Sequence, residues 1–256
     1  MPPAPPATVT TDDHALAVEI GADIGRLLLE LRASAAAAGL DADRLRDEGD
    51  RQAHERIVAL LAAARPDDAV LSEEGADDSR RLSAPRVWIV DPLDGTREFG
   101  EPGRTDWAVH VALVVAGTPV VGAVALPAQE RMLSTRPAPP LPPPRPGPLR
   151  VVLSRSRRPA EATRVAEALG AELVPLGSAG AKTMAVVLGH VDAYVHAGGL
   201  FQWDSAAPVA VAAAAGLHVS RIDGSPLVYN AAELSLPDLL VCRPELADAC
   251  LAALGG

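Results

Sequence analysis

The sequence predicts an α/β protein in which an α+β N-terminal part precedes an α/β C-terminal part. Two long segments, about 10–39 and 47–65, carry apolar residues at helical spacing and are followed by short strand-like apolar runs. In the second half of the chain strands and helices alternate, which is typical of a sheet covered by layers of helices. The proline-rich stretch 136–148 separates the two patterns. We interpret it as an extended linker between two domains, 10–135 and 149–256.

The N-terminal elements begin after a predicted disordered tail, residues 1–9. Thr10 can cap the first helix, and Gly39 is a suitable stop for it. The second helix is expected to begin at about Asp47, which places Asp50 in its first turn, and to end before a proline.

Two strands then deliver acidic residues at their ends. The short strand 69–72 is followed by a pair of glutamates, of which Glu73 is the first. The apolar run 87–90 reads as a buried strand that stops at Asp91, because Pro92 removes a ladder donor.

The remaining strands and helices are predicted from turn signals and periodicity. Residues 107–115 and 120–126 form a hairpin across Ala-Gly-Thr-Pro. The C-terminal elements are expected in the order strand 151–153, helix 160–169, strand 172–175, helix 181–188, strand 193–196, helix 204–215, a small hairpin region and strand 239–242.

Composition excludes several classes of function. A net charge of −10 over 256 residues disfavours duplex nucleic acid or an anionic membrane as a partner. No apolar run approaches the ~20 residues that span a bilayer, and the first residues lack a secretory signal pattern. Cys242 and Cys250, the only cysteines, indicate a reduced compartment. We therefore expect a cytoplasmic protein, and a small phosphorylated substrate remains compatible with the charge because bound cations reverse the local sign.

The stretch 87–96 carries the strongest chemical signal. Asp91, the Leu93 carbonyl and Asp94 offer hard oxygen ligands, which suit magnesium, and the Thr96 hydroxyl follows directly. This arrangement predicts metal-assisted phosphoryl chemistry. Taken alone, an Asp-x-x-Asp turn is explained as well by turn formation, and a helix-start Asp204 by capping.

Three motifs taken together resemble the inositol monophosphatase superfamily of magnesium-dependent, lithium-sensitive phosphatases. They are Glu-Glu at 73–74, Asp-Pro-Leu-Asp-Gly-Thr at 91–96 and Trp-Asp-Ser-Ala-Ala at 203–207. Within that superfamily the chain looks most like the CysQ-type bisphosphate nucleotidases of actinobacteria. The supporting stretches are 49–51, 65–74, 95–99, 103–107, 180–182 and 223–227. The resemblance implies a layered α-β-α-β-α sugar-phosphatase-like fold. It also implies removal of the 3′-phosphate from 3′-phosphoadenosine 5′-phosphate, or its 5′-phosphosulfate, in sulfur assimilation.

The resemblance also implies a metal centre. One magnesium ion would be held by Glu73, Asp91 and the Leu93 carbonyl, and a second by Asp91, Asp94 and Asp204. Two such ions can clamp the attacking and leaving oxygens of an in-line displacement. A third, weaker ion is allowed, and the role of the second glutamate, Glu74, stays open.

Catalytic and substrate roles follow from the same resemblance. Thr96, oriented by Asp50, would position and activate the attacking water. The expected substrate-binding residues are Glu73, Asp94, Gly95, Thr96, Ser154, Arg155, Lys182 and Asp204. For Lys182 a solvated surface lysine is the alternative.

Several residues and functions keep a second interpretation. Tyr194 could stack on adenine but fits core packing better, and His110 and His196 are read as structural. Trp203 is read as a packing anchor that fixes its neighbour, and relatives often carry histidine where Arg157 stands. The alternative functions are an inositol or fructose-1,6-bisphosphate phosphatase and, less favoured, a non-catalytic metal- or nucleotide-binding regulator. Both a monomer and a homodimer are compatible with the sequence.

Overall fold

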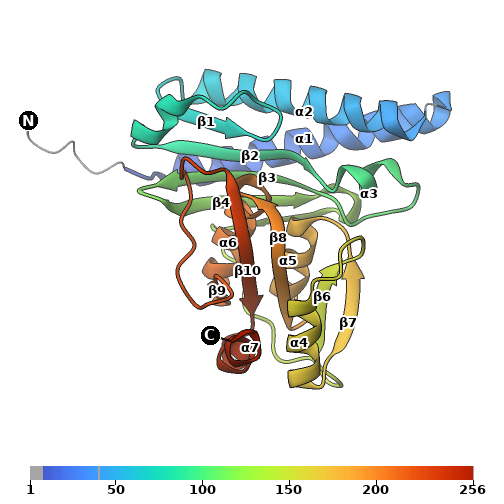
Figure 1. Ribbon diagram of the computed structural model, residues 1–256. Coiled ribbons are helices and arrows are strands. Elements are labelled where there is room, and N and C mark those ends of the chain that lie inside the picture. Colours follow the sequence, from blue (N-terminus) through green and yellow to red (C-terminus); the bar gives the residue numbers. More distant parts are fainter. Residues whose placement is uncertain (1–7, 40, 256) are drawn as a thin grey trace, which may run out of the picture.

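The protein is built of five alternating layers, α-β-α-β-α (Figure 1). The computed structural model describes residues 8–39 and 41–255, so residues 1–7 of the predicted tail lie outside it. The outer layer is a pair of long helices, α1 (Thr11–Ala38) and α2 (Ala42–Ala64). This layering confirms the predicted fold class. No helix among the described residues is both long and apolar enough to cross a membrane.

The first helix confirms the predicted boundaries, whereas the second begins earlier than predicted. The Thr10 side chain caps α1, and Gly39 ends it with a φ of 64°. The start at Asp47 is wrong: the Asp41 side chain accepts from the Arg44 backbone N–H, and the helix runs from Ala42. The first turns of α2 are highly charged, so they carry little apolar periodicity. Because α2 begins at Ala42, Asp50 lies well inside the helix and not in its first turn.

The first sheet has the strand order β1-β2-β3-β4-β5. Its strands are β1 (Ala69–Ser72), β2 (Val87–Asp94), β3 (Ala108–Val115), β4 (Thr118–Leu126) and β5 (Arg131–Ser134). Only β1 and β2 are parallel. The predicted hairpin is confirmed, with Ala116 and Gly117 both at positive φ in its turn. The edge strand β5 was not predicted, because its four residues carry two adjacent apolar side chains, Met132 and Leu133, and therefore show no alternation.

The prediction that β2 stops at Asp91 is wrong, since the strand continues to Asp94. Asp91 lies opposite His110 and Asp94 opposite Ala108, with a shift of register between the two pairs. Pro92 is tolerated because it lies in this irregular stretch, and because the pairing of β2 with β1 ends at Val90. The irregularity places two carboxylates at one end of a central strand.

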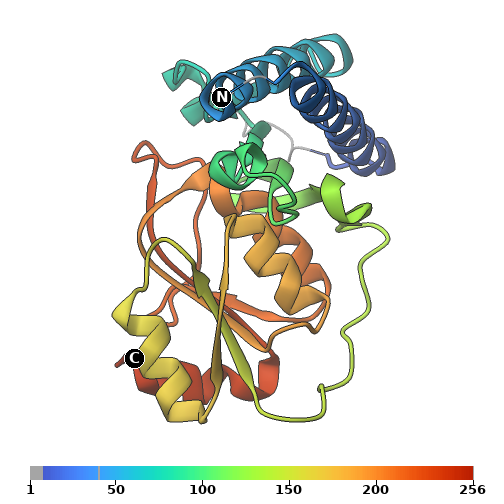
Figure 2. The same ribbon diagram turned by 90° about the vertical axis from the view of Figure 1, so that its right-hand side faces the viewer.

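The second sheet has the order β7-β6-β8-β10-β9. Its elements follow one another as β6 (Arg150–Ser154), α4 (Ala160–Leu169), β7 (Glu172–Leu176), α5 (Ala179–Val187), β8 (Ala193–Phe201), α6 (Gln202–Ala214), β9 (His218–Ser220), β10 (Ser235–Cys242) and α7 (Ala247–Leu254). Residues 136–149 carry no helix or strand and cross from one sheet to the other along the side seen in Figure 2. The division into two domains at this crossing stays a prediction.

Three apolar layers hold these elements together. Side chains alternate along β2, so that Trp88 and Val90 face the helix pair while Val87 and Ile89 face the middle layer with α5 and α6. A third cluster joins the far face of the second sheet to α4 and α7. Because of the same alternation, Asp91 is directed toward the middle layer, where α6 begins.

Candidate functional site

Three carboxylates converge where β2 ends and α6 begins. One oxygen each of Asp91, Asp94 and Asp204 lies within 4.8 Å of the others. Asp91 and Asp94 are buried, while Asp204 is half-buried. Hard oxygen donors at this spacing can hold a divalent cation.

Asp94 is anchored by the loop that precedes α5. Its Oδ2 accepts from Ser178 Oγ at 2.5 Å and from the Gly180 N–H at 2.6 Å, and its Oδ1 accepts from the Ala179 N–H at 3.1 Å. Burial opposes its ionisation, but the nearby His110 ring, the charge of Lys182 and the hydrogen bond from Ser178 outweigh burial and lower the pKa of Asp94 to about 2. Asp94 is therefore a fixed, ionised carboxylate.

His110 packs directly against the cluster, although its sequence pattern indicated only a structural residue. Its Nε2 lies 3.3 Å from Asp94 Oδ2, and its Nδ1 lies 3.1 Å from the Trp203 carbonyl oxygen. A Cβ at Gly180 would overlap His110 Nε2, so only glycine fits there. The alternating pattern of residues 107–115 predicted that His110 lies on a strand, but it could not predict that His110 contacts Asp94 and Gly180.

Asp91 is the least satisfied member of the cluster. Its Oδ1 accepts from the Leu93 N–H at 3.1 Å, whereas its buried Oδ2 has no hydrogen-bond partner among the described residues. Burial and the charges of Glu73, Asp94 and Asp204 raise the pKa of Asp91 well above its usual value. Such an orphaned oxygen among acidic neighbours fits a bound cation, which would supply the missing partner.

Glu73 and Asp204 add two further acidic groups near Asp91 and Asp94, each from a different element. Glu73 directly follows β1 and is exposed to solvent. The protein around it and the charge of Asp204 nevertheless raise its pKa to about 8. Burial and Asp94 raise the pKa of Asp204 to about 7. Asp204 Oδ2 also accepts from the Phe201 N–H at 2.6 Å, so this residue secures the start of α6 while it faces the cluster.

Thr96 lies beside these carboxylates at the start of the short helix α3 (Thr96–Gly100). Its Oγ1 is 3.1 Å from the Leu93 carbonyl oxygen and 3.4 Å from Asp50 Oδ1. Burial, followed by the charge of Glu74, raises the pKa of Asp50 to about 7. Gly95 precedes Thr96 with a φ of 88°, which favours glycine at this turn.

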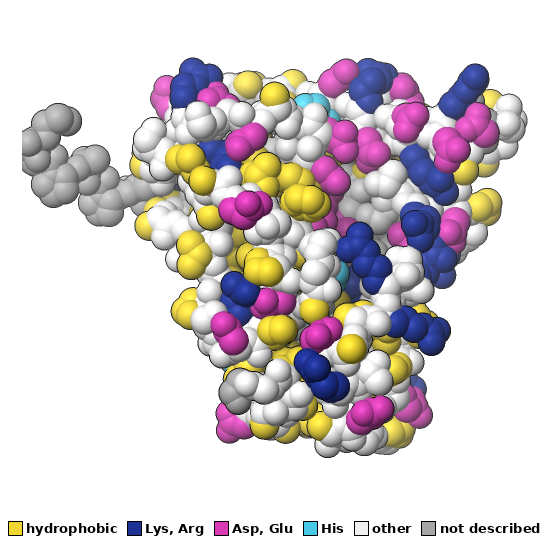
Figure 3. All heavy atoms as spheres, in the orientation of Figure 1, with side chains coloured by type: hydrophobic (Ala, Val, Ile, Leu, Met, Phe, Trp, Pro, Cys, Tyr) yellow, Lys and Arg dark blue, Asp and Glu magenta, His cyan; other side chains and the backbone are white. Residues whose placement is uncertain are grey.

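A cleft of about 300 Å³ opens from the cluster toward the second sheet. Figure 3 shows acidic and basic side chains facing each other across a hollow between the helix pair and the second sheet. The lining includes Gly95, Thr96, Ser154, Lys182 and Asp204, all expected to bind substrate. It also includes Ser156, Arg157, Tyr194, His196 and Gly199, for which sequence patterns indicated no firm role.

Two of the expected substrate contacts are engaged with protein groups. Arg155 donates to Glu98 Oε1 and Glu101 Oε1, both at 2.5 Å, and thereby ties the end of β6 to α3. Lys182 is buried, and its Nζ donates to the Ser178 carbonyl at 2.6 Å and the Gly177 carbonyl at 3.3 Å. The alternative of a solvated lysine is therefore wrong.

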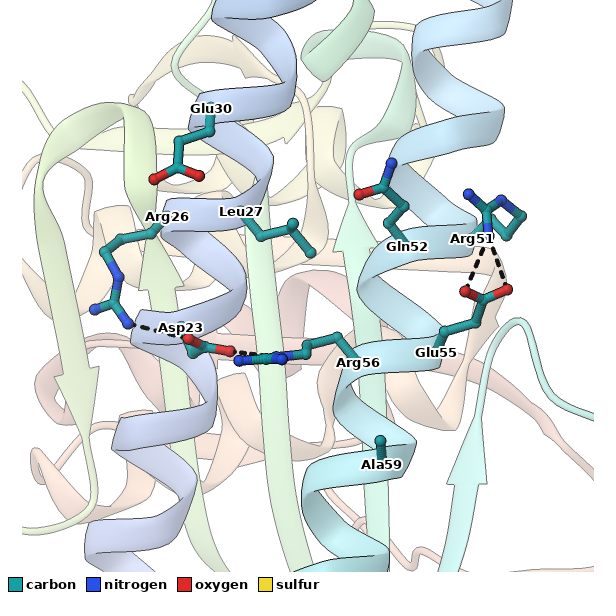
Figure 4. Close-up of a pocket in the computed structure, with 9 residues that line it drawn as sticks. All are labelled: Asp23, Arg26, Leu27, Glu30, Arg51, Gln52, Glu55, Arg56 and Ala59. Atoms are coloured by element: carbon teal, nitrogen blue, oxygen red, sulfur yellow. Dashed lines mark hydrogen bonds and ion pairs between the residues drawn. The ribbon is translucent and has the colours of Figure 1, made fainter.

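A larger groove, of about 660 Å³, lies between α1 and α2 and is separate from this site (Figure 4). Five of its charged side chains pair with one another: Arg56 and Arg26 pair with Asp23, and Arg51 pairs with Glu55. It holds none of the cluster residues and offers no comparable chemistry.

Comparison with known proteins places this geometry among phosphatases. The model of the inositol monophosphatase family matches residues 9–138 and 146–254. A 3′-phosphoadenosine 5′-phosphate phosphatase of Mycobacterium bovis is 51% identical over 241 residues, covering 91% of this chain and 89% of that protein. The 3′(2′),5′-bisphosphate nucleotidase CysQ of Escherichia coli is 36% identical over 204 residues, covering 72% and 79%. The crystal structure of CysQ from Bacteroides thetaiotaomicron superposes with a TM-score of 0.79 at 29% identity, covering 91% and 97%.

Proposed function

The chain belongs to the inositol monophosphatase family, and from this we propose that it hydrolyses the 3′-phosphate of 3′-phosphoadenosine 5′-phosphate and its 5′-phosphosulfate, a reaction of sulfur assimilation. The reaction class rests above all on one observation. An unpartnered oxygen of Asp91 lies within a three-carboxylate cluster. The neighbouring Thr96 donates a hydrogen bond to a further carboxylate, Asp50, outside that cluster. The choice of nucleotide rests on the similarity to phosphatases named for that substrate.

The metal assignment is part of the proposal. Glu73, Asp91 and the Leu93 carbonyl would hold one Mg²⁺, and Asp91, Asp94 and Asp204 a second, with a third near Asp50 and Glu74 left open. When bound, magnesium supplies electrostatic stabilisation for the charge that develops on the phosphoryl oxygens. The raised pKa values of Glu73, Asp91 and Asp204 support this assignment, because desolvation and the negative charges of neighbouring carboxylates disfavour ionisation of each one, and a bound divalent cation would offset that repulsion.

The residues of the chain then orient the nucleophile. Thr96 Oγ1 has one proton to donate, and the nearby acceptors are the Leu93 carbonyl and Asp50. When Oγ1 donates its hydrogen bond to Asp50, its lone pairs are free to accept a hydrogen bond from the attacking water. Asp50, with a pKa of about 7, can hold the proton that passes through Thr96 near neutral pH.

The cleft supplies the substrate contacts in this proposal. Gly95, Thr96 and Ser154 line it and would contact phosphoryl and hydroxyl groups of the substrate. Lys182 contributes positive charge from beneath the loop 177–180 and holds that loop in place. Arg155 as a direct contact stays a prediction, because its guanidinium pairs with Glu98 and Glu101.

The test is phosphate release from a small substrate panel. The purified protein is given 3′-phosphoadenosine 5′-phosphate, inositol 1-phosphate or fructose 1,6-bisphosphate, each with Mg²⁺ and with a chelator. We expect the nucleotide to show a kcat/KM at least about tenfold above the sugars, and activity to be lost on chelation. Equal or higher efficiency on a sugar phosphate would overturn the nucleotide assignment. Full activity in the chelator would overturn the metal assignment.

A further inference from the structure

Arg81 is a buried arginine whose donors tie together two distant parts of the chain. It lies in the 3₁₀ helix η1 (Ser79–Ser83), in the segment that follows Glu73, and is only 1% exposed. Its Nε and Nη2 donate to Asp77 at 2.6 and 3.1 Å. Its Nη1 donates to Asn230 Oδ1 at 2.8 Å and to the Ala231 carbonyl at 3.0 Å. Asn230 Nδ2 in turn donates to the Arg81 carbonyl at 3.0 Å.

The Ala231 carbonyl is shared with the start of α6. Gln202, also 1% exposed, donates through Nε2 to the Ala231 carbonyl at 3.1 Å and to the Glu233 carbonyl at 2.7 Å. A carbonyl oxygen has two lone pairs and can accept both donors at once. One backbone oxygen thus links Arg81, which follows Glu73 along the chain, to Gln202, two residues before Asp204.

We propose that Arg81 is a positioning residue that, through the Ala231 carbonyl and Gln202, sets the spacing between Glu73 and Asp204. These two carboxylates come from separate elements, since Glu73 follows β1 and Asp204 lies in the first turn of α6. In the proposed site Glu73 and Asp204 hold neighbouring ions, and without this network metal binding would have to include the entropic cost of ordering the segment 73–83. The inference rests on the metal site of the proposed function and adds a residue that does not itself touch the metal, the substrate or the water.

The experiment compares three variants that share one neighbourhood. Arg81→Met removes every donor at similar side-chain length. Asn230→Gly removes only the amide, because Asn230 has a φ of 55°, which glycine adopts without strain. Arg80→Met is the matched control, since Arg80 belongs to the same 3₁₀ helix but is exposed and pairs only with Asp78.

Mn²⁺ binding, measured by calorimetry on the purified proteins, is the primary readout. We expect Arg81→Met to weaken Mn²⁺ affinity by about 10- to 100-fold and Asn230→Gly by about tenfold, as for other groups that orient metal ligands. Arg80→Met should stay within about twofold of wild type, since exposed ion pairs contribute little. With saturating Mg²⁺, kcat and the KM for substrate should return to within about threefold of wild type in the first two variants, because the metal itself then orders the ligands.

The outcomes separate the inference from the function. Thermal melting checks that each variant is folded, and if Arg81→Met does not fold, Asn230→Gly decides. A folded Asn230→Gly or Arg81→Met with wild-type Mn²⁺ affinity would overturn the inference. A wild-type protein that binds Mn²⁺ but releases no phosphate would overturn the proposed function. The Mn²⁺ affinities of the variants would then still decide whether Arg81 positions the metal ligands. A wild-type protein that binds no Mn²⁺ would overturn both.

Discussion

Replacing Asp94 with asparagine tests whether the charge of Asp94 is needed for catalysis separately from its contribution to the stability of the fold. The substitution keeps the size of the side chain and removes one negative charge. In the structure each carboxylate oxygen of Asp94 is already used, Oδ2 by Ser178 Oγ and the Gly180 N–H and Oδ1 by the Ala179 N–H. We expect Asp94→Asn to be folded but nearly inactive.

The magnitudes follow from those contacts. An asparagine oxygen can replace one carboxylate oxygen, so its amide nitrogen must face at least one N–H donor. Losing one such charge-assisted bond costs about 1–3 kcal/mol, which is well below the ~5–15 kcal/mol stability of an ordinary domain. The melting temperature should fall by about 2–12 °C. If Asp94 holds a metal ion as proposed, losing its charge removes several kcal/mol of transition-state stabilisation, and about 4 kcal/mol corresponds to a thousandfold loss in kcat/KM.

The assay pairs phosphate release with thermal melting, and Ser178→Ala is the control. That variant removes the 2.5 Å hydrogen bond to the same Oδ2, together with the cap that Ser178 Oγ gives the Ala181 N–H, but keeps the charge. We expect a similar loss of stability and a loss of kcat/KM below about 30-fold, since only one hydrogen bond to the Asp94 carboxylate is lost. If Ser178→Ala is as inactive as Asp94→Asn, or if Asp94→Asn stays within a few-fold of wild type, the charge argument is refuted.

Three further predictions concern proton transfer, packing and acid stability. Because the pKa of Asp50 is raised to about 7, wild-type kcat/KM should fall as the pH drops below that value; Asp50→Asn should lower the rate by about 10²–10⁴-fold and flatten this acidic limb of the pH–rate profile. Gly180→Ala should lower the melting temperature and the activity together, since its Cβ would overlap a buried ring nitrogen of His110; an active variant with an unchanged melting temperature would contradict this close approach of His110 to Gly180. Burial opposes ionisation of Asp13, but hydrogen bonds from two arginines lower its pKa far below the usual ~3.9, so its contribution is present above about pH 4 and is lost as the pH falls. Asp13→Asn should therefore reduce the free energy of unfolding by about 3 kcal/mol at pH 7 in urea titrations, with a smaller difference from wild type at pH 3.

Local sequence patterns predicted most of the secondary structure because each pattern reports a local physical preference. The helix α4 agrees with its prediction to the residue, since its periodicity is bounded by Pro159 and Gly170. The failures have equally local causes. The first turns of α2 carry charge in place of an apolar stripe, and β5 is too short to show alternation. The extension of β2 through Pro92 depends on where its neighbours β1 and β3 end and shift register, which the proline itself does not reveal.

The sequence by itself determined the chemical inventory of this protein: which acidic residues stand at the ends of strands and helices, and that Thr96 follows Asp94 across a glycine turn. Only the tertiary structure decided how these groups are held. The anchoring of Asp94 by the loop 178–180, the contact of His110 with Gly180 and the burial of Lys182 join residues that are far apart in the chain. Local preferences act over a few neighbouring residues, whereas these contacts arise only when separate layers pack together, so no local pattern could specify them.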